Sequence, residues 1–435
     1  MNIFQLIISL IYYARLDFRY YYFYKYKHNL KKSHEEIQKY QLERLKKLLR
    51  HAYETTDYYK KLFDEIKFDV NNFNSLEDFK KIPVLTKELV KNNFDSLKSK
   101  KKYKLIEISS GGSTGNRVTI LKDKRYFEIS RAVVMRDLYS VGLKPGSKVA
   151  WVWGSPIENK KLKANFLERL NWFINRRTIF NTYYYTDEDI KKWLFNDLKK
   201  FNPDFIYGYA TAIRDIALFA KKNNFDLKYP KLKKILTTAQ KLEDRELIEN
   251  VFKCKVLDHY GCREIESIAI EDENYVMHSS DDFVLVEVDK NNEIILTPLE
   301  SYGMPLIRYK NGDIGFIKKK QESKTAFNVF NIQIGRSVEI LRTKDGKKVY
   351  SGIINREIGD KKIEIGEFQL VQNSYDEIIL NIVNEESKIN KKNLIELKKI
   401  IKEKLGITKI KINYLKEFPI ESSGKKIGYK CLIKD

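Results

Sequence analysis

A glycine- and hydroxyl-rich segment between Ile108 and Ile120 has the residue types that bind phosphate groups. Residues 109–115 of this segment comprise three glycines and four hydroxyl residues, namely Gly111, Gly112, Gly115, Ser109, Ser110, Ser113 and Thr114. Glycine lets backbone N–H groups approach a ligand closely, and short hydroxyls add hydrogen-bond donors to phosphate oxygens. No Gly-Lys-Ser/Thr follows, so the segment is not a Walker loop. Alone, it fits either a phosphate-binding loop or a hairpin turn.

Four further motifs follow downstream, in the order in which they occur in one enzyme superfamily, and they favour the phosphate-binding interpretation. They are Tyr260-Gly261-Cys262-Arg263-Glu264, Arg308-Tyr309-Lys310-Asn311-Gly312-Asp313, Gly335-Arg336-Ser337 and Ser422-Ser423-Gly424-Lys425. With the glycine-rich loop, they resemble the adenylate-forming ligases, which make an acyl-AMP from a carboxylic acid and ATP. The connecting sequence is similar to the branch of phenylacetate–CoA ligases and the capsular-polysaccharide protein CapK. This resemblance covers nearly the whole chain after about residue 35.

The resemblance implies a set of nucleotide-binding residues. The Ser109–Gly115 loop would hold the β- and γ-phosphates of ATP, Tyr260 would stack on adenine beside Gly261, and Asp313 would accept hydrogen bonds from the ribose hydroxyls. Glu264 would reach Mg²⁺, a hard cation that prefers carboxylate oxygen. Two simpler alternatives stay open, in which Glu264 is a solvated residue at a helix start and Asp313 is a plain turn residue.

Two basic residues complete the catalytic set that the resemblance implies. Arg336 matches the arginine just before the interdomain hinge, and Lys425 matches the lysine that contacts the carboxylate and the α-phosphate, with Lys426 as the fallback. A lysine there would offset charge in the transition state of adenylation. The chain departs from its relatives at Arg117, where a proline is usual, and at Val338, where an acidic residue is usual.

The resemblance also implies a pocket for the carboxylic acid. By their positions relative to the family motifs, the residues expected to line it are Trp153, Tyr207, Tyr209, Ala210, Thr237, Ala239 and His259. An aromatic wall suits an apolar or aromatic acid, although aromatic residues also form ordinary core. Gln240 stands where relatives often have glutamate. Some relatives carry a cysteine–histidine metal site, for which Cys254, His259, Cys262 and His278 are the candidates here. Their spacing lacks a Cys-x-x-Cys pair, which favours satisfied core residues over zinc ligands.

Composition limits the class of partner. The 435 residues include 82 lysines and arginines against 59 acidic residues, a formal charge of +23. This charge favours anionic partners such as ATP, CoA or acidic lipid. The lysines are scattered and no nucleic-acid module is present, so we expect no nucleic-acid partner. Three cysteines without paired spacing fit a reducing cytoplasmic location.

Residues 1–32 form an apolar stretch followed by a segment rich in tyrosine and lysine. The apolar stretch, about fourteen residues, is shorter than the roughly 20 that a membrane-spanning helix needs. No basic residue precedes it and no small-residue cleavage site follows it, which argues against a signal peptide. Two interpretations remain: a helix docked on the protein's own surface, or an interfacial anchor that contacts acidic lipid at the inner face of the cell membrane.

The pattern of apolar residues predicts an α/β fold with three parts. Ser33 to Glu36 has the form of a capping box, and a helix is expected over 34–54. Strands are expected over 149–153, 205–207 and 235–238 and helices over 186–201 and 213–223, which implies a largely parallel sheet. Strands over 283–288, 293–297 and 314–317 suggest a β-rich subdomain. We therefore expect an adenylation core at 33–336 and a small mobile α+β lid at 337–435.

The predicted function is ATP-dependent formation of an acyl-AMP, followed by transfer of the acyl group, with CoA as the favoured acceptor. The CapK resemblance suggests a role in cell-surface polysaccharide assembly. Two alternatives stay open: a ligase that adenylates a deazaflavin cofactor, and a non-catalytic, membrane-associated biosynthesis factor that keeps the fold for binding.

Overall fold

The computed structural model describes residues 10, 12–14, 16–109, 118–154, 172–182, 184–290, 292–318, 326–334, 340–417 and 428–433. The chain divides into two compact units, each built from segments that are distant in sequence. The first unit contains residues 1–110, 118–146 and 257–335, and the second contains 111–117, 147–256 and 336–435. Among the described helices, none is both long enough and apolar enough to cross a membrane.

The long helix α3 (His34–Thr55) opens the core of the first unit. The predicted capping box is confirmed, since Glu36 N donates to Ser33 Oγ at 3.2 Å and Ser33 N donates to Glu36 Oε2 at 2.7 Å. Three short helices follow: α4 (Asp57–Glu65), α5 (Leu76–Phe79) and α6 (Lys87–Asn92). One apolar side of α3 is fully buried against these helices and the loop before β13, through Leu45, Leu48, Leu49 and Ala52.

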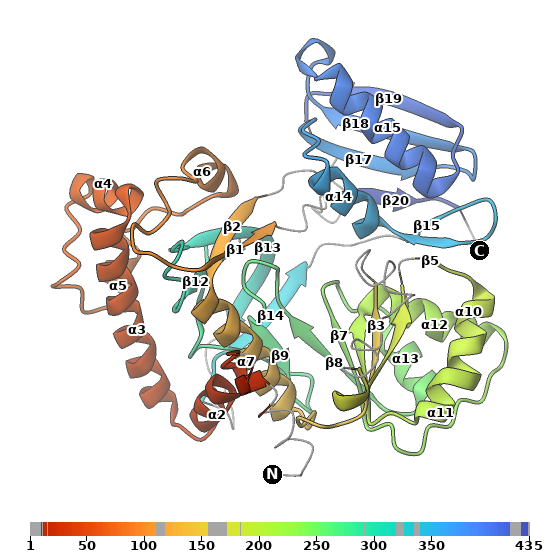
Figure 1. Cartoon of the computed structure of the whole chain (residues 1–435), viewed down its shortest axis with the longest axis horizontal. Helices are drawn as coiled ribbons and strands as arrows, with labels where there is room; N and C mark the ends of the chain where they lie inside the picture. Colours follow the sequence, from red (N-terminus) through yellow and green to blue (C-terminus); the bar gives the residue numbers. More distant parts are fainter. Residues whose placement is uncertain are drawn as a thin grey trace. The chain divides into compact units, whose positions relative to one another are not determined.

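Helix α2 (Arg19–Asn29) packs against helix α7 (Lys124–Ser140) in the first unit (Figure 1). Its inner side buries Tyr20, Phe23 and Tyr26. At the C-terminal end of α2, Asn29 Nδ2 donates a hydrogen bond to Asp282 Oδ2 at 2.8 Å. For residues 19–29, the structure therefore has a helix docked on the protein's own surface.

The first unit contains a hairpin and a largely antiparallel sheet. The hairpin pairs β1 (Leu105–Ser109) with β2 (Thr119–Asp123) in continuous register. The sheet has the order β11-β12-β13-β14-β10-β9-β8. Its strands are β8 (Lys255–Tyr260), β9 (Ala269–Glu271), β10 (Met277–Ser279), β11 (Val284–Val288), β12 (Glu293–Pro298), β13 (Tyr309–Lys318) and β14 (Val329–Ile334). The predicted β-rich subdomain is confirmed, and β13 is longer than the predicted 314–317.

The second unit contains the predicted parallel sheet. Strand β3 (Val149–Trp153) pairs in parallel with β4 (Arg177–Asn181) and β6 (Phe205–Tyr209), and β6 pairs in parallel with β7 (Lys234–Thr238). The helices are α10 (Asp187–Lys192), continued by π-helical turns at Trp193–Leu198 and α11 (Lys199–Phe201), then α12 (Ala210–Lys222) and α13 (Arg245–Phe252). Figure 1 shows these helices gathered on one side of β3 and β7.

The C-terminal part of the second unit has a hydrophobic core of its own. Strands β15 (Ile340–Arg342) and β16 (Lys348–Tyr350) form a small sheet with β5 (Tyr184–Tyr185). Helix α14 (Ser351–Asp360) and helix α15 (Lys391–Leu405) accompany a sheet of order β19-β18-β17-β20 (Figure 1). Those strands are β17 (Glu367–Gln372), β18 (Glu377–Val383), β19 (Lys409–Leu415) and β20 (Tyr429–Cys431). The core draws its buried residues from positions 341 to 429 alone.

Candidate active site

Tyr260 ends strand β8 and lies at the centre of a buried triad with Asn311 and Asp313. Its hydroxyl donates to Asp313 Oδ2 at 2.8 Å and accepts from Asn311 Nδ2 at 2.8 Å. Asn311 Nδ2 also donates to Asp313 Oδ2 at 2.7 Å. Burial, and then the nearby Asp313 carboxylate, raise the pKa of Tyr260 well above its usual value, so its hydroxyl stays protonated. The triad therefore fixes one carboxylate oxygen of Asp313.

Tyr309, Asn311 and Asp313 form one row along strand β13. They are 0%, 1% and 8% exposed, whereas Lys310 and Gly312 between them are more open. This alternation is the period-2 pattern of a strand with one buried side. Gly312 has a φ of +86°, which glycine adopts without steric cost. The Asn-Gly-Asp sequence thus lies inside a strand, and Asp313 is not a plain turn residue.

Glu264 is held by the first residue of that row. Tyr309 Oη donates to Glu264 Oε1 at 3.0 Å, and Tyr126 Oη donates to the backbone oxygen of Glu264 at 3.2 Å. The glutamate is 3% exposed and belongs to the loop between β8 and β9. The alternative of a solvated residue at a helix start is therefore wrong. Its carboxylate oxygens suit a hard cation such as Mg²⁺.

Gly261 is required by a close approach of two backbone segments. A Cβ atom at this position would lie 2.1 Å from the backbone oxygen of Glu266. The same loop is closed by a hydrogen bond from Cys262 N to the backbone oxygen of Ile265 at 2.9 Å. Burial raises the pKa of the Cys262 thiol well above its usual value, so this cysteine stays protonated. Only glycine allows the tight loop that presents Glu264.

The β1–β2 hairpin is joined to this loop through two side chains. Arg263 Nη1 donates to the backbone oxygen of Ser109 at 3.2 Å. Lys122 is fully buried, and its Nζ lies 3.5 Å from Glu266 Oε1. The base of the glycine-rich segment therefore lies beside the loop that carries Glu264. The remaining predicted residues lie outside the described part of the chain: Ser110, Gly111, Gly112, Ser113, Thr114, Gly115, Arg336 and Lys425.

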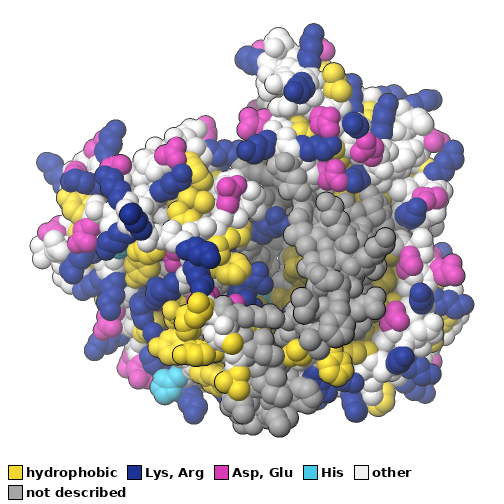
Figure 2. Space-filling model, viewed as in Figure 1, with side chains coloured by type: hydrophobic (Ala, Val, Ile, Leu, Met, Phe, Trp, Pro, Cys, Tyr) yellow, Lys and Arg dark blue, Asp and Glu magenta, His cyan; other side chains and the backbone are white. Residues whose placement is uncertain are grey.

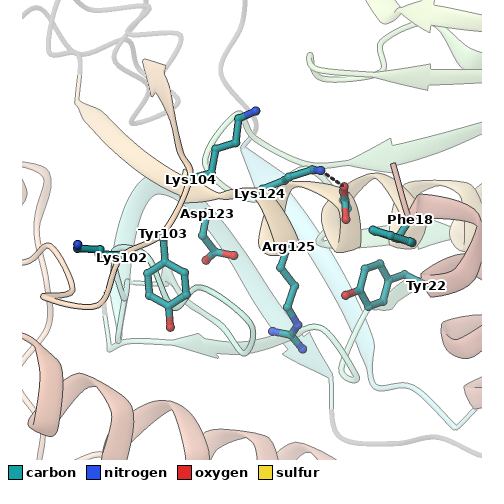
Figure 3. Close-up of a pocket in the computed structure, with 9 residues that line it drawn as sticks. Phe18, Tyr22, Lys102, Tyr103, Lys104, Asp123, Lys124 and Arg125 are labelled. Atoms are coloured by element: carbon teal, nitrogen blue, oxygen red, sulfur yellow. Dashed lines mark ion pairs between the residues drawn. The ribbon is translucent and has the colours of Figure 1, made fainter. Parts of the chain in front are cut away.

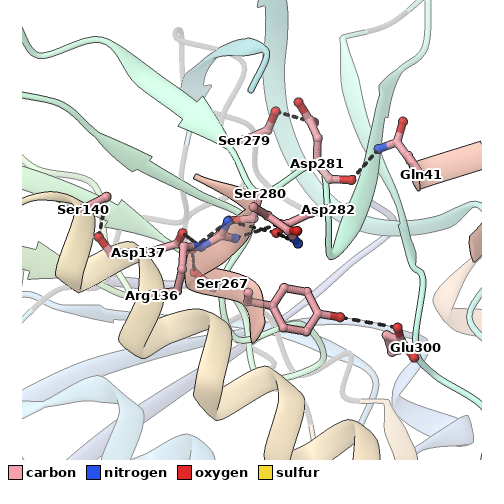
Figure 4. Close-up of polar contacts among 12 residues, drawn as sticks. Gln41, Arg136, Asp137, Ser140, Ser267, Ser279, Ser280, Asp281, Asp282 and Glu300 are labelled. Carbon is pink, nitrogen blue, oxygen red and sulfur yellow. Dashed lines mark hydrogen bonds and ion pairs between the residues drawn. The ribbon is translucent and has the colours of Figure 1, made fainter. Parts of the chain in front are cut away.

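A network of buried ion pairs and hydrogen bonds connects helix α7 to the loop between β8 and β9 (Figure 4). Arg136, which is 0% exposed, forms a bidentate pair with Asp282 at 2.8 and 3.1 Å and contacts Asp137 through Nε. Asp137 Oδ2 accepts a hydrogen bond from Ser267 Oγ, and Ser267 Oγ lies 2.8 Å from His259 Nε2. Burial lowers the pKa of His259, so its ring is neutral at pH 7. Helix α7 thus anchors the segment from β8 to β9.

Most of the predicted acid-pocket residues lie at the carboxyl ends of parallel strands in the second unit. Trp153 ends β3 and stacks on Tyr209, which ends β6, with ring centroids 4.4 Å apart. The carboxyl ends of parallel strands are the usual binding edge of an α/β sheet. Tyr207, Ala210 and Thr237 are buried, and Ala239 is exposed just after β7. His259 belongs to the first unit.

Gln240 has a structural contact that explains its side-chain position. Its Oε1 accepts hydrogen bonds from Thr211 N at 2.9 Å and from Thr211 Oγ1 at 2.6 Å. Thr211 lies in the first turn of α12, so the amide oxygen satisfies a backbone donor that has no partner within the helix. A carboxylate could accept the same bonds, and the amide adds a donor that a glutamate at this position would lack.

The candidate zinc ligands have other hydrogen-bond partners. His278 Nε2 lies 3.2 Å from Asp272 Oδ2, and His259 contacts Ser267 as described above. Burial raises the pKa of Cys254 to about 12. Within the described ranges, no group of three or more histidine, cysteine, aspartate or glutamate side chains is placed to hold a metal ion.

Sequence reasoning missed the residues that orient the site. Tyr309 and Asn311 hold Glu264 and Asp313, and Tyr126 and Arg263 attach the loop to α7 and to the hairpin. Spacing contained part of the signal, because residues 309, 311 and 313 follow the period of two that places side chains on one side of a strand. The contact of Tyr126, 138 positions before Glu264, has no local signal.

Comparison with known proteins gives one match to a protein family and several to whole proteins. Residues 341–434 match the CapK C-terminal domain family. The chain is 28% identical to Protein CapK of Staphylococcus aureus over 374 residues, which covers 83% of this chain and 80% of that protein. It is 22% identical to the phenylacetate-coenzyme A ligase of Thermus thermophilus over 302 residues, covering 65% of this chain and 66% of that enzyme.

The fold is shared with a solved ligase structure. A 2-hydroxyisobutyryl-CoA ligase in complex with 2-HIB-AMP and CoA superposes with a TM-score of 0.59 at 18% identity, covering 93% of this chain and 91% of that one. The predicted α/β fold of adenylate-forming enzymes is therefore confirmed. In sequence the chain is thus similar to Protein CapK and to phenylacetate–CoA ligases along most of its length, and its C-terminal part matches the CapK C-terminal domain family.

Proposed function

We propose that the protein is an AMP-forming acid–CoA ligase. A carboxylate oxygen of the acid would attack the α-phosphorus of ATP, the bond to the leaving pyrophosphate would break, and an acyl-AMP would remain. The thiol of CoA would then attack the acyl carbonyl carbon, lose its proton, and release AMP. The observation that carries this proposal is the row on β13, which holds Asp313 and Glu264 through Asn311 and Tyr309.

The Tyr260–Asn311–Asp313 triad would bind the nucleoside. One oxygen of Asp313 is already fixed by two donors, and a carboxylate has acceptor capacity for ribose hydroxyls as well. Because the Tyr260 hydroxyl stays protonated, it keeps Asp313 oriented over the working pH range. The Ser109–Gly115 loop, whose base is tied to Arg263, would hold the β- and γ-phosphates.

Glu264 would hold a magnesium ion on the phosphates, and this ion would neutralise charge as pyrophosphate leaves. The residues fit the ion in chemistry, since a carboxylate is a preferred ligand and Tyr309 restricts it to one orientation. Preorganised groups of this kind lower the barrier because they need no rearrangement when the charge develops.

The acid would contact the stacked Trp153 and Tyr209 at the carboxyl edge of the parallel sheet, which suits an aryl or other apolar acid. The predicted lid, 337–435, would bring Lys425 to the reacting carboxylate, while Arg336 would contact the ribose or phosphate. The separate core of residues 341–429 supports movement of this part as one body. A role in cell-surface polysaccharide assembly stays a prediction from the resemblance to CapK.

ATP–pyrophosphate exchange tests the proposal. We expect exchange that depends on one acid within a panel of aryl, fatty and hydroxy acids. Lys425→Ala should reduce it by roughly 10²–10³-fold, the cost of losing one preorganised electrostatic group. Lys426→Ala is the matched control and should retain the exchange. Exchange that is equal in the two variants would remove Lys425 from the mechanism, and absence of ATP binding would remove the proposal.

A further inference from the structure

The outer side of helix α2 and the residues before it expose an apolar ridge. Tyr21 and Tyr24 are 63% and 42% exposed on α2, and Leu10, Tyr13 and Leu16 before it are 58%, 66% and 63% exposed. Figure 2 shows hydrophobic side chains gathered over this helix, with lysines and arginines beside them. Single exposed apolar residues are ordinary, but a contiguous group marks an interaction surface.

The ridge is rigidly supported by the protein beneath it. Phe23 packs edge-on against Tyr139 of α7, with ring centroids 5.8 Å apart. Tyr26 Oη donates to Glu300 at 3.4 Å, and Asn29 is bonded to Asp282. The exposed tyrosines are therefore presented at fixed positions, with their backbone bonds already satisfied within α2.

The sequence segment that contains helix α2 is basic. From Phe18 to His34 the sequence contains no aspartate or glutamate, and it contains one arginine and four lysines: Arg19, Lys25, Lys27, Lys31 and Lys32. The acidic residue just before this stretch, Asp17, is neutralised by an ion pair with Arg19. An apolar ridge in a basic, acid-free segment is complementary to an anionic lipid surface.

A basic pocket opens beside the ridge, between the start of α2 and the start of α7 (Figure 3). Its volume is about 300 Å³, and its lining includes the cations Lys102, Lys104, Lys124 and Arg125 and the carboxylates Asp123 and Glu128. The two carboxylates are engaged: Asp123 accepts hydrogen bonds from three backbone N–H groups, and Glu128 lies 3.7 Å from Lys124.

Two of the pocket's cations are available for a ligand. In the described part of the chain, neither Lys102 nor Lys104 has a carboxylate partner, and both are exposed. The pocket is distinct from the nucleotide site. It lies where Leu105 pairs with Asp123, whereas the glycine-rich loop leaves the other end of the hairpin, where Ser109 pairs with Thr119. Four residues of strand separate these ends, about 13 Å.

We propose that the ridge and the pocket form a docking surface for an anionic membrane, in which the phosphate of a lipid headgroup enters the pocket and Tyr21 and Tyr24 lie at headgroup level. In the sequence, the stretch from Ile3 to Ile11, which precedes the ridge, is also rich in apolar residues. In peripheral membrane proteins, aromatic side chains commonly lie at the membrane interface while lysines contact anionic lipid headgroups. This proposal does not depend on the enzymatic activity proposed above.

Vesicle sedimentation of the full chain tests the proposal. We expect binding to phosphatidylcholine vesicles that contain phosphatidylglycerol, and none to pure phosphatidylcholine. The double variant Lys102→Gln with Lys104→Gln should bind roughly 30-fold more weakly, about 1 kcal/mol for each lysine. The double variant Tyr21→Ser with Tyr24→Ser should weaken binding even at high salt, because its loss is apolar.

Matched controls separate this docking surface from general charge. Lys221 and Lys222 are exposed on α12, so Lys221→Gln with Lys222→Gln removes the same charge elsewhere and should bind as wild type does. Tyr375→Ser is the corresponding aromatic control. Equal losses in the control and pocket variants would overturn the proposal. So would complete displacement by inorganic phosphate at constant ionic strength, which would indicate a soluble anion as the ligand.

Discussion

The hydroxyl of Tyr260 offers a direct test of how Asp313 is held. Tyr260→Phe removes one hydrogen bond to a carboxylate, worth about 1.5–3 kcal/mol, and one from an amide, worth about 0.5–1.5 kcal/mol. Asn311 keeps its own bond to Asp313, so part of the orientation survives. We therefore expect the free energy of unfolding to fall by about 3 kcal/mol. The KM for ATP should rise roughly tenfold, since 1.4 kcal/mol of lost binding is a factor of ten.

Tyr59→Phe is the matched control. Tyr59 is buried as well, and its hydroxyl donates to the backbone oxygen of Pro305 at 3.2 Å and accepts from Ile307 N at 3.0 Å. Its loss should lower the free energy of unfolding by about 2 kcal/mol and leave the KM for ATP unchanged. Urea unfolding followed by circular dichroism and steady-state kinetics measure the two quantities. An unchanged stability for Tyr260→Phe, or equal KM shifts in both variants, would refute this reasoning.

Three further predictions concern the support of the site. Gly261→Ala places a Cβ 2.1 Å from the backbone oxygen of Glu266, so calorimetry should show a lower Tm and titration with ATP should show weaker binding. A variant with the Tm and the ATP affinity of wild type would contradict the close approach of the two backbone segments. Arg136→Met leaves Asp282 and Asp137 without their cation, so the free energy of unfolding measured in urea should fall by about 3–5 kcal/mol. A much smaller decrease, as expected for a solvent-exposed ion pair, would contradict the buried network. Burial raises the pKa of the Asp281 carboxyl group to about 6, so this group binds a proton more tightly in the folded protein than in the unfolded chain. Protonation of Asp281 therefore stabilises the folded protein at low pH, and this contribution is lost as the pH rises through about 6. The unfolding free energy of wild type relative to Asp281→Asn should therefore fall by about 3 kcal/mol between about pH 4 and about pH 7, and a pH-independent difference would contradict the raised pKa.

Local patterns in the sequence predicted much of the fold. The capping box at Ser33 and Glu36 and the strand Val149–Trp153 occur where expected, because capping and apolar runs act over a few residues. Strand β17 was missed because buried glutamines hide its pattern. Gln372, for example, is buried since its amide group bonds to both the N–H and the carbonyl of Arg342, thirty positions away.

The candidate site was only partly predictable for a similar reason. The motifs identified Tyr260, Glu264 and Asp313, and the structure joins Tyr260 and Asp313 directly. The Asn-Gly-Asp sequence suggested a turn, because Gly312 at φ +86° is typical of turns, yet the strand continues through it. The contacts that Tyr126 makes with the Glu264 loop follow from packing between distant segments, which no local pattern encodes.

Direct detection of the intermediate tests the central claim, that this site forms an acyl-AMP. The protein would be incubated with ATP, Mg²⁺ and an acid from the panel, without CoA, and the quenched mixture examined by mass spectrometry. The account predicts an acyl-AMP together with pyrophosphate, conversion to acyl-CoA and AMP once CoA is added, and loss of the acyl-AMP in Glu264→Gln. Formation of ADP in place of AMP, or an undiminished acyl-AMP yield in Glu264→Gln, would contradict it.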